Sequence, residues 1–311
     1  MATYCFGVDV GGTTVKMGLS QTTGELVDKW EIPTKVQNQG EAILPDISIA
    51  IEKKLKERGI AKGEIAGIGM GVPAPVLCDG IVKDTVNLGW GYKEVKRELE
   101  ELTGLTVRVA NDANIAALGE MWKGGGAGYS NLVMVTLGTG VGGGVILDGH
   151  ILTGVNGGAG EVGHLYVDAD ETEPCGCGKC GCLEQYASAT GIVRIAKRHL
   201  KNNQKKTILN AENITAKDVF DAVKKEDEVA KEIAEIFGRY LGYALANVSA
   251  VVDVEAFVIG GGVSKAGEVL LDYVKKYYAE KAFWAHRNAE FTLAKLGNDA
   301  GIYGGAKLAL E

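Results

Sequence analysis

Two segments of the chain share one pattern: a strand, a turn rich in glycine and threonine, a second strand, a tight turn and a third strand. The first segment starts with VDVGGT at residues 8–13, and the second starts with VTLGTG at residues 135–140. An internal repeat of this length indicates a duplicated domain, in which two similar turns face one cleft. Two ordinary, unrelated hairpins would give the same pattern, so both interpretations stand at this point.

Glycine is the composition's main departure from an ordinary globular protein. The 311 residues include 45 glycines, about twice the usual share, and only 5 prolines. The glycines follow no triplet period, which excludes collagen, and the apolar content of 46% disfavours wholesale disorder. We therefore expect glycines in tight turns and where backbone approaches a ligand.

Charge and apolar stretches limit the partners and the compartment. The net charge of −7 and the absence of a Lys/Arg block disfavour nucleic acid as a partner. Residues 1–5 lack the basic region of a signal peptide. The uncharged stretch 124–147 is long enough to span a bilayer, but its glycine, serine, asparagine and threonine content indicates a turn and a strand. We expect a cytoplasmic protein without a membrane partner.

Periodicity and turn residues predict an α/β chain. Strands are expected at 5–10, 15–20, 26–32, 65–72, 106–110, 132–137, 145–147, 151–152, 256–259 and 291–295. Helices are expected at 41–58, 93–103, 113–122, 228–252 and 302–310. A domain boundary is expected at the glycine-rich run 124–128. A second meander follows this run, and after the meander the chain is loop-like to about residue 183.

The two glycine–threonine turns are candidate phosphate sites. Turns of this kind leave backbone N–H groups free of side-chain obstruction, and consecutive free N–H groups bind anions. The candidate residues are Gly11, Gly12 and Thr13 in the first turn and Gly138, Thr139 and Gly140 in the second. Asp9 precedes the first turn, where a carboxylate beside phosphate calls for Mg²⁺. Lys16 could add positive charge near the transferred phosphate, or be a solvated strand residue.

Two further glycine turns need separate interpretation. Residues 138–143 match the dinucleotide pattern G-x-G-x-x-G, but a strand and hairpin follow instead of the required helix, so nicotinamide dinucleotide binding is rejected. The turn at 260–262 does precede a helix. Gly261 and Gly262 could let a nucleotide lie close to the backbone, or simply allow tight strand–helix packing.

Four cysteines fall within eight residues: Cys175, Cys177, Cys180 and Cys182. In a cytosolic chain this spacing favours a metal site over disulfides. Structural Zn²⁺ takes four cysteines or three cysteines and a histidine, and His164 lies eleven residues upstream. A set that includes His164 would leave one cysteine over. The spacings do not match the usual iron–sulfur runs.

Acidic side chains surround this cysteine loop and occur at one strand-to-helix junction. Glu161 and Glu184, beside a cysteine loop held by a metal ion, would form a rigid polar pocket for a polyhydroxylated ligand. Glu184 alone could equally be a solvated loop residue. Asn111 and Asp112 come where a strand delivers the chain to a helix. Asp112 could cap the helix, or act as a base oriented by Asn111 and kept charged by the helix N-terminus.

Taken together, these motifs resemble the ROK family (repressors, open reading frames and kinases) of the actin-like sugar-kinase superfamily, most of all its bacterial glucokinases. The resemblance covers nearly the whole chain. It is carried by residues 9–13, 71–76, 87–90, 111–114, 137–144, 158–164, 175–184 and 186–191. One departure is Ala74, where the family usually has glycine, which puts the local loop conformation in question.

The resemblance implies an actin-like ATPase (ribonuclease H-like) fold of duplicated α/β domains with a cleft between them. The implied domains are 1–112 with 300–311, and 113–299 with the zinc loop, so that the last helix returns to the N-terminal domain. It implies Asp112 as the general base and Zn²⁺ on His164, Cys175, Cys177 and Cys182, with Cys180 spare. The candidate sugar contacts are Asn87, Asn111, Asp112, Glu161, His164 and Glu184.

The expected reaction is ATP-dependent phosphorylation of glucose at its 6-hydroxyl, a glycolytic step, with ATP and Mg²⁺ held by the residues of the turns above. A kinase for N-acetylmannosamine or N-acetylglucosamine of the same family is the first alternative, and a non-catalytic sugar sensor is the second. The resemblance also implies a homodimer. Repressor members carry an N-terminal helix-turn-helix, for which a phosphate motif at Asp9 leaves no room.

Overall fold

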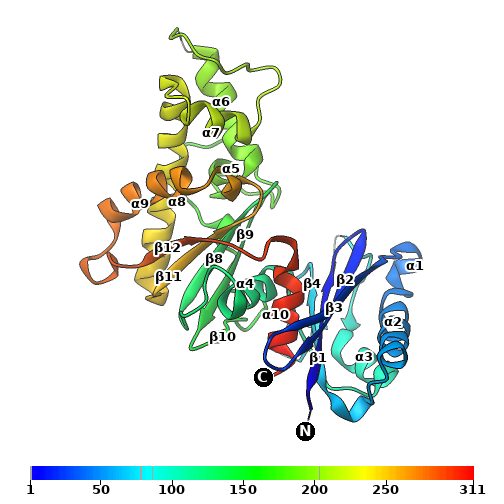
Figure 1. Cartoon of the computed structure of the whole chain (residues 1–311). Helices are drawn as coiled ribbons and strands as arrows, with labels where there is room; N and C mark the ends of the chain where they lie inside the picture. Colours follow the sequence, from blue (N-terminus) through cyan, green and yellow to red (C-terminus); the bar gives the residue numbers. More distant parts are fainter. Residues whose placement is uncertain (1, 78, 86, 203) are drawn as a thin grey trace. The chain divides into compact units, whose positions relative to one another are not determined.

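The computed structural model describes residues 2–77, 79–85, 87–202 and 204–311. The chain divides into two compact units, which are described separately here (Figure 1). Unit 1 comprises Met1–Ser130, Gly144–Gly160 and Leu296–Glu311, and unit 2 comprises Asn131–Gly143 and Glu161–Lys295. The division after residue 112 that the sequence suggested for the domains stays a prediction.

A five-stranded mixed sheet forms the centre of unit 1. Its strands are β1 (Tyr4–Val10), β2 (Thr14–Gln21), β3 (Leu26–Pro33), β4 (Ile65–Val72) and β7 (Val107–Asn111), in the order β3-β2-β1-β4-β7. β1, β2 and β3 form an antiparallel meander, whereas β4 runs parallel to β1 and β7 parallel to β4. The expected N-terminal meander is therefore confirmed, with a parallel extension on its other side.

The remaining elements of unit 1 are mostly helical. They are α1 (Gln37–Gly40), α2 (Ile43–Arg58), η1 (Lys62–Glu64), β5 (Ile81–Val82), β6 (Lys93–Glu94), α3 (Val95–Thr103), α4 (Asp112–Lys123), η5 (Gly297–Asp299) and α10 (Ala300–Leu308). The helix expected from residue 41 begins at Ile43, which leaves Pro45 in the first turn, where its missing N–H costs nothing.

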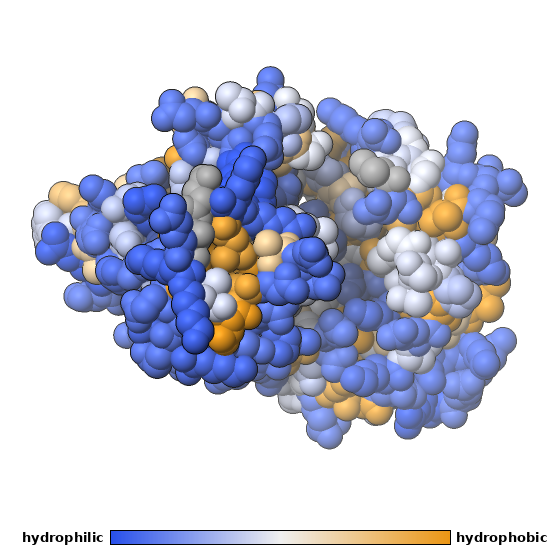
Figure 2. Space-filling view, turned by 90° about the horizontal axis from the view of Figure 1, so that it is seen from above, coloured by the Kyte–Doolittle hydropathy of each residue, from blue (hydrophilic) through white to orange (hydrophobic). Residues whose placement is uncertain are grey.

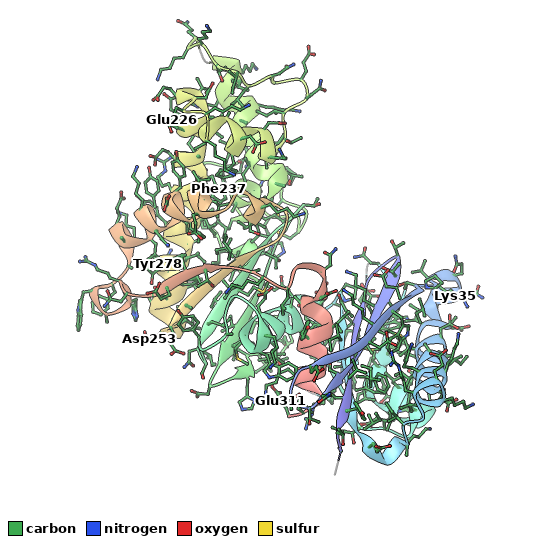
Figure 3. The ribbon with its side chains drawn as sticks, viewed as in Figure 1. Lys35, Glu226, Phe237, Asp253, Tyr278 and Glu311 are labelled. Atoms are coloured by element: carbon green, nitrogen blue, oxygen red, sulfur yellow. The ribbon has the colours of Figure 1, made fainter. Side chains whose placement is uncertain are left out.

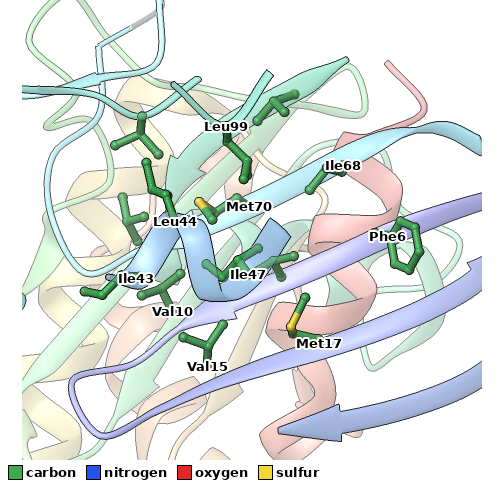
Figure 4. Close-up of a cluster of buried hydrophobic side chains, with 14 of the residues drawn as sticks. Phe6, Val10, Val15, Met17, Ile43, Leu44, Ile47, Ile68, Met70 and Leu99 are labelled. Carbon is green, nitrogen blue, oxygen red and sulfur yellow. The ribbon is translucent and has the colours of Figure 1, made fainter. Parts of the chain in front are cut away.

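One face of the unit 1 sheet is apolar and is covered by α2 and α3 (Figure 1). Alternate residues of β1 and β2, such as Phe6, Val8 and Met17, are fully buried there. Ile47 of α2 and Leu99 of α3 pack into the same cluster (Figure 4). The period of two along the strands and of about 3.6 along the helices explains why the local sequence pattern predicted these elements.

The opposite face of the same sheet is lined by glycine and packs against α10. A Cβ atom built on Gly7 would lie 1.9 Å from the carbonyl oxygen of Ile302, and one on Gly69 would lie 1.9 Å from that of Gly305. Glycine is therefore required there because helix and strand backbones touch. Several glycines of this chain serve helix–sheet packing instead of a ligand, which the composition alone did not reveal. The last helix, α10, therefore lies against β1, β4 and β2 of the first sheet.

A second sheet repeats the strand order of the first. It contains β8 (Leu132–Leu137), β9 (Val141–Leu147), β10 (His150–Ile151), β11 (Ala256–Gly260) and β12 (Glu290–Leu293), in the order β10-β9-β8-β11-β12. β10 is antiparallel to β9, whereas β11 is parallel to both β8 and β12. The shared order confirms that the two segments that begin at residues 8 and 135 start duplicated folds, not unrelated hairpins.

Helices account for most of the rest of unit 2. They are η2 (Val162–His164), α5 (Glu184–Ala187), α6 (Ala189–Asn202), α7 (Ala216–Val223), α8 (Glu228–Val252), η3 (Val263–Ala266), α9 (Glu268–Lys281) and η4 (Trp284–His286). Phe237 of α8 and Tyr278 of α9 point into the interior of the unit (Figure 3). Phe237 stacks edge-on to Phe220, and Tyr278 to Phe257.

Two local expectations differ from the structure. The strand expected at 145–147 already begins at Val141, so three glycines lie in a strand instead of a turn. A Cβ on Gly144 would lie 2.7 Å from the Cβ of Ala117, so close packing on α4 explains that glycine. The glycine run at 124–126 is a turn held by the buried Glu120, whose carboxylate accepts the Gly125 N–H at 2.7 Å.

Within the described residues, no helix is long and apolar enough to cross a membrane. Hydrophilic residues cover most of the face seen in Figure 2, and the hydrophobic areas between them are small.

Candidate active site

The first glycine–threonine turn joins β1 to β2 in unit 1. Its Gly12 and Thr13 are exposed, while Gly11 donates its N–H to the Thr14 carbonyl at 3.0 Å. The hydroxyl of Thr34 donates to the Gly11 carbonyl at 2.7 Å. The turn is thus fixed from its carbonyl side, which suits a turn whose amides are to face a ligand. Thr34 is a supporting residue that the sequence motifs did not indicate.

Asp9 lies near the end of β1, directly opposite Lys16 of β2. Burial raises the pKa of Asp9 to about 6, the charge of Lys16 opposes this rise, and Asp112 adds to it. The Lys16 ammonium donates to the carbonyl of Asn298 at 3.4 Å. A Cβ on Gly301 would lie 2.6 Å from the Asp9 carboxyl, so α10 begins directly against this side chain. The structure thus groups Asp9, Lys16 and Asp112 electrostatically.

Asn111 and Asp112 lie at the junction of β7 and α4. Asn111, not Asp112, is the N-cap: its side-chain oxygen accepts the N–H groups of Ala113 at 2.9 Å and Asn114 at 3.3 Å. Asp112 is the first helical residue, and its carboxylate accepts the Ala113 N–H at 2.8 Å. A carboxylate in the first turn is stabilised in its charged form by the helix dipole. The capping role considered for Asp112 therefore belongs to its neighbour.

Two other residues of unit 1 flank these groups. Asn87 is exposed, and a Cβ on Gly12 would lie 3.5 Å from its Cβ, so Asn87 lies beside the first turn. Ala74 is buried, and its carbonyl accepts the Asn111 side-chain amide at 3.3 Å. Ala74, the departure from the family pattern, thus still orients Asn111 through a backbone atom.

The second glycine–threonine turn lies between β8 and β9 and is linked to Glu184, the first residue of α5. Gly138 donates to the Gly140 carbonyl at 3.0 Å. One Glu184 oxygen accepts the Val141 N–H at 2.9 Å, and a Cβ on Gly140 would lie 2.3 Å from that oxygen. The Thr190 hydroxyl donates to the Thr139 carbonyl at 2.8 Å. Glu184 therefore stabilises this turn by its hydrogen bond to Val141, and it is also a candidate sugar contact.

The structure brings the four predicted zinc ligands together in unit 2. One ligand atom from each of His164, Cys175, Cys177 and Cys182 lies within 4.8 Å of all the others. Cys177 and Cys182 are 3.6 Å apart at sulfur, and burial raises the pKa of the Cys182 thiol. Cys180 lies outside this cluster and donates instead to the Thr172 carbonyl at 3.5 Å. Three sulfurs and one imidazole form a donor set suited to tetrahedral zinc.

Glu161 and His164 bracket the short helix η2. Both are exposed, and the His164 N–H donates to the Glu161 carbonyl at 3.1 Å. The other oxygen of Glu184 accepts from the Cys175 thiol at 3.5 Å. The His–Cys cluster is thus linked to Glu184 by a side-chain hydrogen bond and to Glu161 through the η2 backbone.

The third glycine turn borders an apolar pocket of about 280 Å³ in unit 2. Gly261 has a φ of +83°, and a Cβ there would lie 2.5 Å from the Leu137 carbonyl oxygen. Gly262 is exposed and lines the pocket with Ala216 and Phe220 of α7 and Val263. Gly261 is therefore a packing glycine, whereas Gly262 borders space for a flat apolar group. The packing interpretation therefore applies to Gly261, whereas nucleotide binding at Gly262 stays a prediction.

Sequence reasoning missed the α7 wall of this pocket. Thr215 caps α7 and forms a capping box with Asp218, a signal that the spacing T-x-x-D carries. The box fixes where α7 starts, and so where Ala216 and Phe220 lie. That the helix faces Gly262 is a tertiary contact with no local pattern.

Comparisons with known proteins agree with this geometry. Residues 5–311 match the ROK family. A glucokinase of Halalkalibacterium halodurans is 48% identical over 311 residues, which cover 98% of this chain and 94% of that protein. The structure of a ROK family glucokinase from Streptomyces griseus in complex with glucose and AMPPNP is 32% identical, with a TM-score of 0.73 and 98% of each chain covered.

A ROK hexokinase structure from Thermus thermophilus is 30% identical, with a TM-score of 0.81, and the match covers 98% of this chain and 97% of that one. This chain belongs to the ROK family and has its actin-like ATPase fold.

Proposed function

We propose that the protein is a glucokinase, which transfers the terminal phosphoryl group of ATP to the 6-hydroxyl of glucose. The observation that carries this proposal is the 48% identity to a glucokinase over nearly the whole of both chains. The geometry supports it, because the candidate residues lie at turns, at helix ends, in the cysteine loop or, for Asp9 and Lys16, on strands β1 and β2 beside the first turn.

Asp112 is proposed as the general base. It would accept the proton of the attacking sugar hydroxyl, and it lies in the first turn of α4, where the helix dipole favours a carboxylate in its charged form. Asn111 fixes the start of that helix through two N–H groups, so it orients Asp112 and remains a candidate sugar contact. Asn87, Glu161, His164 and Glu184 are the other proposed sugar contacts.

The nucleotide is proposed to bind through both glycine–threonine turns and the pocket at Gly262. Backbone N–H groups of the turns would bind phosphate oxygens. The pocket walls at Ala216, Phe220 and Val263 are apolar, as a stacked nucleobase requires. Lys16 would add positive charge on the side of the first turn.

Mg²⁺ is proposed at Asp9. A carboxylate is the donor that Mg²⁺ prefers, and the raised pKa of Asp9 indicates that its ionised form lacks sufficient positive charge nearby. The ion would neutralise charge on the transferred phosphate.

Structural zinc is proposed on His164, Cys175, Cys177 and Cys182. Their donor atoms already cluster, and a cation would favour the thiolate of buried Cys182. Zinc there would stiffen the loop that leads into Glu184. We further propose a cytoplasmic homodimer that acts in glycolysis, and light scattering on the purified protein tests the dimer.

The decisive experiment measures ADP release over glucose, mannose, fructose, N-acetylglucosamine and N-acetylmannosamine. Glucose is expected to give the highest kcat/KM. Turnover of an amino sugar with inert glucose would make the protein an N-acetylhexosamine kinase instead. Sugar binding without ADP release would make it a sensor.

Asp112→Asn tests the proposed base in the same assay. The variant is expected to fold and bind glucose but to lose about 10²-fold or more in kcat, the scale of general-base catalysis. Near-normal turnover would remove Asp112 from this role.

A further inference from the structure

Glu120 of α4 is a fully buried glutamate whose carboxylate binds backbone from two distant parts of the chain. It is 0% exposed. One oxygen accepts the Gly125 N–H at 2.7 Å, and the other accepts the Leu296 N–H at 2.8 Å. Burial of a carboxylate is costly unless hydrogen bonds compensate, and bonds from N–H groups to a charged acceptor are strong. The side chain therefore fixes both backbone segments firmly.

One of these segments precedes the first exit of the chain from unit 1, and the other begins its last return. Unit 1 comprises Met1–Ser130, Gly144–Gly160 and Leu296–Glu311, so Glu120 binds the first residue of the part that returns last. A Cβ on Gly124 would lie 1.9 Å from a Glu120 oxygen. Glycine at that position is thus needed to let the carboxylate reach both amides.

The returning residues 296–301, here called the return segment, run from Glu120 to the candidate phosphate residues. Lys16 donates to the Asn298 carbonyl at 3.4 Å, and Lys29 forms an ion pair with Asp299 at 2.7 Å. The segment ends at Gly301, which packs against the Asp9 carboxyl. Its start is therefore fixed by Glu120, and its end forms the wall against which Asp9 lies.

We propose that Glu120 is a positioning residue for phosphoryl transfer, acting through the return segment on Asp9 and Lys16. This inference rests on the proposed kinase function. The two bonds described above join the Glu120 carboxylate to backbone, so the effect proposed here passes through the position of that backbone. Loss of its two hydrogen bonds frees the return segment and lets Asp9 and Lys16 shift. The step that uses ATP is then impaired, whereas the sugar contacts at Asn111 and Asn87 keep their supports.

The test compares Glu120→Ala and Glu120→Gln with a matched control, Glu100→Gln. Glu100 of α3 also accepts a backbone N–H, that of Val107 at 3.0 Å. Val107 is the first residue of β7, and it is far in sequence from both glycine–threonine turns. Steady-state kinetics give kcat and KM for ATP and for glucose. Hydrogen exchange reports the amides of residues 296–301 independently of activity.

Glu120→Ala is expected to lose roughly 10- to 100-fold in kcat/KM for ATP, the scale of a small misplacement of catalytic groups. KM for glucose should stay within about twofold, and the return segment should exchange faster. Glu120→Gln keeps the shape and one acceptor, so it should lie between wild type and Glu120→Ala. The Glu100→Gln control should match wild type in both readouts.

Unchanged kcat/KM for ATP in both Glu120 variants, or unchanged exchange of the return segment, would overturn the inference. So would a rise in KM for glucose as large as the rise in KM for ATP, because that result indicates general structural damage. If Glu120→Ala does not fold, Glu120→Gln decides by the same criteria. Wild-type protein that releases no ADP with any sugar overturns the proposed function itself, which is a distinct result.

Discussion

Gly301→Ala should destabilise the protein, although the same change in most helices stabilises. An interior helical glycine replaced by alanine ordinarily gains about 1 kcal/mol, and Gly301, the second residue of α10, would gain at most that. Here the new Cβ would lie 2.6 Å from Cγ and Oδ2 of Asp9, inside any allowed contact. α10 cannot withdraw, because a Cβ on Gly304 would lie 1.6 Å from the Ile115 carbonyl oxygen, which shows that the backbones of α10 and α4 already touch.

Asp9 must therefore move, and overpacking of this kind costs about 1–3 kcal/mol. With backbone on both sides we expect the upper end, so the net loss is about 2 kcal/mol after the helix gain is subtracted. Urea denaturation measures this loss. The kcat/KM for ATP should also fall by roughly tenfold or more as the Asp9 carboxyl shifts.

Gly63→Ala is the matched control. Gly63 is exposed, and a Cβ there meets nothing within 4 Å, so its free energy of unfolding should change by no more than about 0.5 kcal/mol. A Gly301→Ala variant as stable as wild type would refute the overpacking argument. The expected loss of stability together with an unchanged kcat/KM for ATP would support the packing argument but contradict the role of Asp9 in ATP use.

Two further predictions concern Asp9 and the cysteine loop. Burial raises the pKa of Asp9 to about 6, against Lys16 and with Asp112, so the folded state favours the protonated acid. The protonated Asp9 carboxyl therefore stabilises the folded state fully below about pH 4, and this stabilisation is lost as the pH rises through about 6. Asp9→Asn, unfolded by urea in a chelator, should therefore match wild type at pH 4 and exceed it at pH 7 by up to about 3 kcal/mol; equal stability at both pH values would contradict this. Cys177→Ser should lose its bound zinc, as measured by elemental analysis, and should melt at a lower temperature. The control Cys180→Ser changes a cysteine that is also exposed and should keep one zinc per chain. Loss of zinc in both variants or in neither would refute the assigned ligand set.

Local patterns predicted the parts of the fold that depend on local rules. The buried run of β1, the glycine–threonine turns and the cysteine spacing all have signatures within about ten residues. The duplicated fold was expected from the repeated pattern, whereas the set of four zinc ligands came from the resemblance to the ROK family, because the spacing alone left open which four residues bind. The start of β9 at Val141 was missed because its glycines look like a turn, whereas the reason for Gly144 is a helix that packs on it.

The rest of the site depends on contacts between residues far apart in the sequence. Nothing near Glu120 indicates that it binds Leu296, 176 residues later. Phe220 and Gly262 meet only in the folded unit. The N-cap differs from the expectation by one residue because Asn111 and Asp112 are both good capping residues, and only the backbone angles decide between them.

The glycine-lined face of the first sheet has a consequence for protein synthesis. α10, which covers that face, is translated after the whole of unit 2, and β1 is among the first strands made. Domains usually fold in the order in which they leave the ribosome, but here the first sheet waits with one face bare until residues 300–308 emerge. Unit 2, which ends at Lys295, can complete its core before unit 1. A ribosome stalled in the last stretch would therefore hold a finished second unit beside an unfinished first one.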